Sequence, residues 1–138
     1  MISYLLDTNV ISEPLRPMPH PQVMERFRQH RSEIAISAVV WHELWFGCLR
    51  LPPSARRRAI EEYLDTVVAP SMPILSYDQA AAVWHAQERA RLSVIGKTPP
   101  FADGQIIAVA KVHDLILVTF NLADYAAFQG VVIEDWRS

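Results

Sequence analysis

The sequence predicts an α/β fold in which helices cover both faces of a central parallel sheet. Short apolar segments alternate with segments of helical periodicity along the chain, and this alternation is typical of parallel sheets. The first apolar segment, 2–6, is apolar enough for a strand covered on both sides. With 138 residues and neither a repeat nor a linker, the chain is expected to form one domain, 1–138.

The individual elements follow from their boundary signals. Four prolines between residues 14 and 21 exclude a long helix and predict a loop after the first strand. Ser37 and Ser54 each precede a helical pattern, and serine is a favoured N-cap. We expect strands at 2–6, 34–36, 73–75, 115–119 and 131–133, and helices at 22–30, 38–51, 55–68, 78–92, 102–113 and 122–128.

Composition limits the class of protein. No apolar run approaches the ~20 residues of a membrane span, and no basic segment precedes an apolar one as in a signal peptide. The single cysteine, Cys48, cannot form an internal disulfide and is expected to be a small core residue. These features predict a cytoplasmic protein.

Charge alone does not indicate a nucleic-acid partner. The formal net charge is −2, so no overall basic field is expected. Basic residues do gather at 26–31 and at 56–58. Each of these clusters, taken alone, is typical of a solvated helix face.

Three acidic residues lie at the edges of apolar segments. Asp7 directly follows the first strand, Glu43 lies on the apolar face of its helix, and Asp103 lies above the apolar stripe of its own. Gly47, one turn after Glu43, lowers helix propensity and leaves room beside that carboxylate. Each acid alone has a structural explanation, such as an ion pair between Glu43 and Arg50 or a favourable interaction of Asp103 with the helix dipole.

Together, the three acids predict a metal site. In parallel sheets, ligands bind beyond the carboxyl ends of the strands, and three carboxylates that meet there repel one another. A hard divalent cation with oxygen ligands removes this repulsion. We expect Mg²⁺, or Mn²⁺, held by carboxylates and water molecules, where it polarises a phosphate and promotes hydroxide formation.

A further polar group follows the strand predicted at 115–119. Thr119 and Asn121 supply a hydroxyl and an amide at the same edge of the sheet. Asn121 is also placed to cap the helix at 122–128, and the two roles are compatible. No histidine joins this group, because His42 lies about 100° from Glu43 around the helix and is expected at the surface or in a structural role.

Four segments occur in the order LLDTN at 5–9, SAVVWHELWFG at 37–47, DGQIIAVA at 103–110 and VTFNLADY at 118–125. In this order they resemble the PIN-domain ribonucleases of the VapC toxin type, including the FitB-like branch. The resemblance extends from residue 2 to about residue 136 and implies a PIN domain, a Rossmann-like α/β/α sandwich. It also implies an acidic Mg²⁺ or Mn²⁺ site and endonucleolytic cleavage of RNA.

The resemblance assigns the acidic site to Asp7, Glu43 and Asp103, and its fourth position to Asn121. The family often has an aspartate at that fourth position, so a second metal ion has one anionic ligand fewer here. A two-metal mechanism is therefore in doubt. The implied chemistry is in-line attack of a metal-oriented water on the phosphate, which leaves a 5′ phosphate and a 3′ hydroxyl. Residues expected to support the site are Thr8, Thr119 and Asp124.

The resemblance also implies partners. Toxins of this type pair with a small antitoxin that inserts a segment across the active site, and an acidic pocket suits its Arg or Lys. A homodimer is expected, with a heterotetramer or larger assembly when the antitoxin is bound. Aromatic residues on the helices expected at the antitoxin groove or dimer face have core packing as their alternative: Trp41, Trp45, Phe46 and Trp84.

Two other functions compete with cleavage. A PIN-like module that binds RNA or protein without cutting is favoured only by Asn121. A Mg²⁺ phosphotransferase or phosphatase would need a second acid two residues after Asp7, where Asn9 stands. The RNA target itself is not encoded in a readable way, although the loop 94–101 is expected to contribute to it.

Overall fold

A five-stranded parallel sheet forms the centre of the molecule, in the order β3-β2-β1-β4-β5. The structure is a computed structural model that describes residues 1–138. The chain runs outward from β1 to β3 and then returns to β4 on the other side of β1, so the strand order reverses between β1 and β4. The strands are β1 (Tyr4–Leu6), β2 (Ile34–Ser37), β3 (Ile74–Leu75), β4 (Ile116–Val118) and β5 (Ile133–Glu134).

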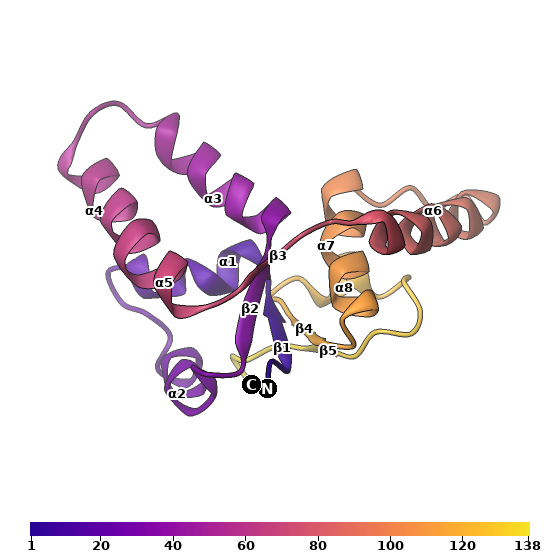
Figure 1. Cartoon of the computed structure of the whole chain (residues 1–138), viewed down its shortest axis with the longest axis horizontal. Coiled ribbons are helices and arrows are strands. Elements are labelled where there is room, and N and C mark those ends of the chain that lie inside the picture. The colour runs from indigo at the N-terminus through magenta and orange to yellow at the C-terminus, as the bar shows by residue number, and fades with distance from the viewer.

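Helices flank the sheet on both sides, as predicted. Figure 1 shows α1, α2, α4 and α5 on one side of the strands and α6, α7 and α8 on the other. The helices are α1 (Thr8–Ile11), α2 (Pro21–His30), α3 (Ala38–Leu49), α4 (Ala55–Tyr63), α5 (Ala69–Ser71), α6 (Gln79–Val94), α7 (Phe101–Val112) and α8 (Leu122–Tyr125), with a 3₁₀ turn η1 (Glu13–Leu15) and a π-helical turn η2 (Leu64–Val68).

Capping side chains set the helix starts where the sequence placed them. The Ser37 hydroxyl accepts a hydrogen bond from the Val40 N–H at 3.1 Å, and the Ser54 hydroxyl accepts one from Arg57 at 3.1 Å. The helix predicted at 38–51 ends earlier, at Leu49. The helix predicted at 55–68 is α4 followed by the wider turn η2, so its last turn is not α-helical.

The prediction of a loop after β1 was wrong in part, because the segment contains α1 and η1. Asp7 is the N-cap of α1, and its Oδ1 accepts a hydrogen bond from the Thr8 N–H at 2.8 Å. A four-residue helix is too short to show a helical period in the sequence. The consequence for the site is that the chain turns into a helix directly at the acidic residue.

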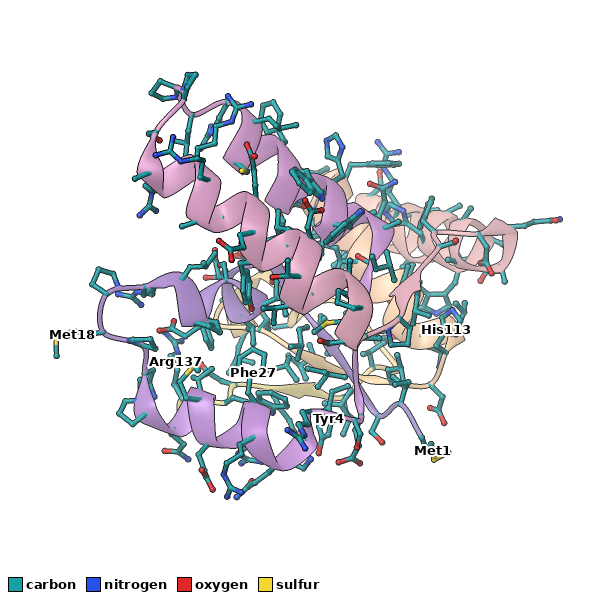
Figure 2. All side chains as sticks on the ribbon, turned by 60° about the vertical axis from the view of Figure 1, so that its left-hand side comes forward. Met1, Tyr4, Met18, Phe27, His113 and Arg137 are labelled. Atoms are coloured by element: carbon teal, nitrogen blue, oxygen red, sulfur yellow. The ribbon has the colours of Figure 1, made fainter.

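The core occupies both faces of the sheet. Leu5, Leu6 and Leu117 are fully buried on the two central strands, and Cys48 is buried as a free thiol, as expected. Trp136 is also fully buried, and its ring meets Tyr4 at 5.3 Å and Phe27 at 5.9 Å between ring centres. Figure 2 shows Tyr4 and Phe27 close to one another beside α2. None of the helices is long and apolar enough to cross a bilayer.

Candidate active site

Asp7 lies where the strand order of the sheet reverses. Its backbone N–H donates to the Val118 carbonyl at 2.9 Å, which continues the pairing of β1 with β4 by one residue. The side chain is 8% exposed. Its Oδ2 accepts hydrogen bonds from the hydroxyls of Thr119, at 2.9 Å, and Tyr125, at 3.1 Å. Together with the Thr8 N–H, these donors fix the orientation of the carboxylate.

Tyr125 is a site residue that the sequence analysis left without a role. It is buried on α8, and its hydroxyl reaches Asp7 from an element 118 positions away in the chain. Burial raises the pKa of Tyr125 far above its usual value, and repulsion from Asp7 and Asp103 raises it further. Tyr125 therefore keeps its proton and acts as a hydrogen-bond donor toward the acids.

Glu43 approaches Asp7 through Thr8. The Thr8 hydroxyl donates to Glu43 Oε2 at 3.0 Å, while the backbone N–H of the same residue donates to Asp7. One residue thus joins two of the predicted acids. The ion pair between Glu43 and Arg50, considered as an alternative, is not formed.

Asp103 completes the acidic group from the first turn of α7. Burial raises the pKa of its carboxyl to about 6, and repulsion from Asp7, Asp124 and Glu43 contributes to this rise. The nearby Tyr125 hydroxyl opposes the shift in part. This rise in the pKa supports the expectation that the three acids lie near one another.

The polar residues after β4 differ in their roles. Thr119 is fully buried, donates to Asp7 and accepts a hydrogen bond from the Asn121 N–H at 3.0 Å. Asn121 occupies the predicted N-cap position of α8, but its side chain makes no capping hydrogen bond. The Asn121 and Asp124 side chains are exposed, and their participation in the site stays a prediction.

Histidines contribute to packing near the site. His42 is exposed and stacks on Phe46, as expected for a surface residue. His85 is buried on α6, with its Nδ1 at 2.9 Å from the Tyr77 hydroxyl, and burial lowers the pKa of its ring. The ring lies against Gly104, the residue that follows Asp103: a Cβ there would overlap Nε2 and lie 2.6 Å from Cδ2. This contact had no signal in the sequence, because it depends on how α6 packs against α7.

The donor set is compatible with a hard divalent cation. No group of three or more His, Cys, Asp or Glu side chains has the spacing to hold a metal ion by itself. Mg²⁺ is commonly bound by one or two carboxylates and several water molecules, and it does not need such a group. Carboxylates that repel one another in partly buried surroundings, with hydroxyl groups beside them and no thiolate, fit that ion.

Comparison with known proteins identifies the family. The family model for the PIN domain matches residues 4–126. The chain belongs to the PIN domain family. Toxin FitB of Neisseria gonorrhoeae is 35% identical over 136 residues, which cover 96% of this chain and 98% of FitB. The tRNA(fMet)-specific endonuclease VapC of Salmonella typhimurium is 30% identical over 137 residues, which cover 99% of both chains.

Solved structures agree with the predicted PIN fold. The FitAcB structure from Neisseria gonorrhoeae matches with a TM-score of 0.88 and 33% identity, covering 96% of this chain and 97% of that chain. The DNA-bound VapBC structure from Salmonella typhimurium matches with a TM-score of 0.86 and 29% identity, covering 99% of both. The α/β/α sandwich with a parallel sheet is therefore confirmed.

The aromatic side chains of this PIN domain divide into two groups. Trp41 and Trp45 meet edge to face at 5.9 Å, and Trp84 lies against Phe128. All three tryptophans are half-buried and pack on the core, as in the alternative interpretation. Phe46 is 59% exposed, so it alone of the four presents most of its side chain to solvent.

Proposed function

We propose that this PIN domain is the toxin of a type II toxin–antitoxin module and cleaves RNA as a Mg²⁺-dependent endoribonuclease. The observation that carries the proposal is that Thr8 donates hydrogen bonds to both Asp7 and Glu43. The negative charges of these two acids also contribute to the raised pKa of Asp103. The names of full-length relatives support it, since these are called toxin FitB and VapC endonuclease or ribonuclease. A cytoplasmic location is supported by the single buried cysteine, which forms no disulfide.

The residues proposed to hold the ion, directly or through its bound water molecules, are Asp7, Glu43 and Asp103, with Mn²⁺ as an alternative to Mg²⁺. When bound, the ion supplies Lewis-acid stabilisation of the phosphate and lowers the pKa of a bound water. Tyr125 and Thr119 orient Asp7, and Thr8 orients Glu43. Such supporting hydrogen bonds typically affect metal affinity or activity by about 10–100-fold.

The proposed reaction is hydrolysis with inversion at phosphorus. The oxygen of one water forms a bond to the phosphorus while the bond to the ribose 3′ oxygen breaks. The 3′ oxygen ends with a proton derived from the water, so the products carry a 5′ phosphate and a 3′ hydroxyl. No histidine is needed as a base, which agrees with the absence of histidine side chains among the hydrogen bonds of the acids.

The proposed partner is a small antitoxin whose cationic side chain enters the acidic site. Two solved neighbours at 30% and 29% identity are the FitAB and VapBC assemblies, each bound to DNA. Another, at 26% identity, is described as a member of the VapBC family of toxin–antitoxin systems. A toxin homodimer, joined into a larger assembly by antitoxin, is the proposed inhibited form.

RNA cleavage by purified, antitoxin-free protein tests the proposal. The wild type is expected to cleave RNA with Mg²⁺ and to lose that activity with a chelator. Asp7→Asn is expected to reduce cleavage by at least 100-fold, because the variant removes one negative ligand. Asp65→Asn is the matched control, since Asp65 is exposed on η2 and should cleave like the wild type. Equal cleavage by wild type and Asp7→Asn would contradict the proposal.

A non-cleaving module that binds RNA or protein is the second candidate. It is favoured by the exposed Asn121, which stands at the fourth position of the family's site without a carboxylate. This alternative predicts that the wild type binds RNA but leaves it intact at every Mg²⁺ and Mn²⁺ concentration.

A further inference from the structure

We propose that the RNA strand enters the acidic site along a groove between the loop after η1 and the α3–α4 pair, where Arg16, Arg50 and Arg56 bind its phosphates. This inference rests on the proposed function and adds the surface that holds the substrate. It assigns three arginines that neither the sequence motifs nor the acidic site accounts for.

The groove is continuous with the acidic site. It has a volume of about 490 Å³, and its lining includes Thr8 and Glu43, the two side chains that share a hydrogen bond. The buried residues Leu44 and Cys48 also line it. A Cβ on Gly47 would meet no atom within 4 Å, so this part of α3 faces open space. The room predicted beside Glu43 is therefore present.

Three arginines line the same groove from three different segments. Arg16 follows η1, Arg50 follows α3 and Arg56 lies in the first turn of α4. Figure 1 shows α3 and α4 side by side beyond the sheet, with α1 below them. Convergence from separate segments distinguishes this cluster from a single solvated helix face.

The groove arginines are free to bind an anion. Arg50 and Arg56 are exposed and form no ion pair, and the side chain of Arg16 is 68% exposed with only a long, 3.4 Å contact to Glu13. The neighbouring Arg57 differs, because it pairs with Glu61 at 2.8 Å and donates to the Leu51 carbonyl. Arg57 is thus committed to the structure.

The chemistry of the groove fits a nucleic-acid strand. The groove lining contains three guanidinium groups and one carboxylate. Because the net charge of the chain is −2, this excess of positive charge is local. Guanidinium groups bind phosphate through two parallel hydrogen bonds. A partner segment that brings its own Arg or Lys would be repelled here. A mostly apolar pocket between α2 and η2, lined by Phe27, Tyr63 and Met72 together with Arg28 and Arg31, offers apolar surface for a protein segment instead.

The salt dependence of RNA binding distinguishes the contribution of the groove arginines from that of the protein's other positive charges. The protein carries Asp7→Asn so that RNA stays intact, and the probe is a short fluorescein-labelled single-stranded RNA of mixed sequence, followed by anisotropy. Each phosphate contact to single-stranded nucleic acid contributes about 0.7 to the slope of log Kd against log salt. We expect R16A/R50A/R56A to lower that slope by about 2 and to weaken binding at least tenfold near physiological salt.

A matched triple variant controls for the charge that is removed. R31A/R58A/R89A deletes three exposed arginines that lie outside the groove and form no ion pair, and it is expected to retain most of the wild-type slope. Replacement of the groove arginines by lysine should also retain most of the slope, because the charge remains. Circular dichroism checks that all variants are folded.

Two results would overturn the inference. One is equal loss of slope in the groove variant and the control variant. The other is unchanged RNA binding by R16A/R50A/R56A in a variant that no longer binds co-expressed antitoxin. That result would assign the groove to the protein partner. Metal-dependent cleavage by the wild type is measured beside them. If the wild type cleaves RNA but R16A/R50A/R56A has the wild-type slope, only the groove inference is wrong. If the wild type does not cleave RNA but the slope of R16A/R50A/R56A falls as expected, only the proposed enzymatic function is wrong.

Discussion

The Tyr125 hydroxyl donates a hydrogen bond to Asp7 Oδ2 at 3.1 Å, and this contact ties α8 to the carboxyl end of β1. Thr119 donates to the same oxygen at 2.9 Å. The Asp7 carboxylate is therefore held by side chains from the segment that follows β4, and its other oxygen remains directed to the start of α1.

Tyr125→Phe removes one of these donors without changing the shape of the side chain. We expect the Mg²⁺ concentration that gives half-maximal cleavage to rise by about 10-fold or more, because supporting hydrogen bonds orient a metal-binding carboxylate. The expected loss of folding stability is about 1 kcal/mol. Cleavage rates over a Mg²⁺ titration provide the measurement.

Tyr63→Phe is the control for that variant. Tyr63 donates to the Ile11 carbonyl at 2.7 Å, away from the acids, and burial raises the pKa of its hydroxyl to about 12. Its loss should reduce stability by a similar amount and leave the Mg²⁺ requirement unchanged. If both variants shift the Mg²⁺ titration equally, Tyr125 has no specific role at the site.

The raised pKa of Asp103 predicts an unusual dependence of folding stability on pH. Its pKa is about 6 in the folded protein against an ordinary value of 3.8, so between these values the folded state binds more protons than the unfolded state. Stability therefore falls as the pH rises through this window and levels off above it. Asp103→Asn removes the effect, and we expect a gain on the order of 1 kcal/mol at pH 8 after solvent screening.

Denaturant unfolding with a chelator present, at several pH values, measures this effect. The wild type and Asp103→Asn are expected to have equal stability near pH 4 and to diverge as the pH approaches 8. Added Mg²⁺ should narrow the gap at pH 8 by stabilising the wild type, since binding to the folded state stabilises it. Parallel pH profiles would show that the pKa of Asp103 is not raised in the folded protein.

The order of the elements could be predicted because it follows from local signals. Short apolar segments between stretches of helical periodicity located the strands, and Ser37 and Ser54 located two helix starts. Asp7 was placed at the carboxyl end of a strand because it directly follows the apolar segment 2–6. The short helix α1 was missed because four residues show no period.

The contacts that hold the site could not be predicted from local signals. Tyr125 reaches Asp7, 118 positions away in the sequence, only because α8 packs against α7 and β5. Likewise, His85 lies against Gly104 only because of the way in which α6 packs on α7. Such contacts depend on tertiary packing between distant segments, and a single sequence carries no period or spacing that encodes them.

Gly104→Ala tests the packing that supports Asp103. The added Cβ would overlap the His85 ring, so we expect a loss of about 1–3 kcal/mol in the free energy of unfolding. Gly47→Ala is the matched control, because its Cβ would meet nothing within 4 Å and helix propensity favours alanine by up to about 1 kcal/mol.

Combining Gly104→Ala with His85→Ala gives a second check in the same unfolding assay. Removal of the ring leaves space for the new methyl group, so the double variant should be more stable than the sum of the single effects predicts. Strict additivity would mean that His85 does not contact residue 104.

The measurement that tests the central claim most directly is the mapping of cellular RNA ends after brief induction of the wild type beside Asp103→Asn. The account predicts new 5′ ends that carry a phosphate in cells with the wild type, and none above background with Asp103→Asn. The same new ends with both proteins, or no new ends with the wild type, would contradict it.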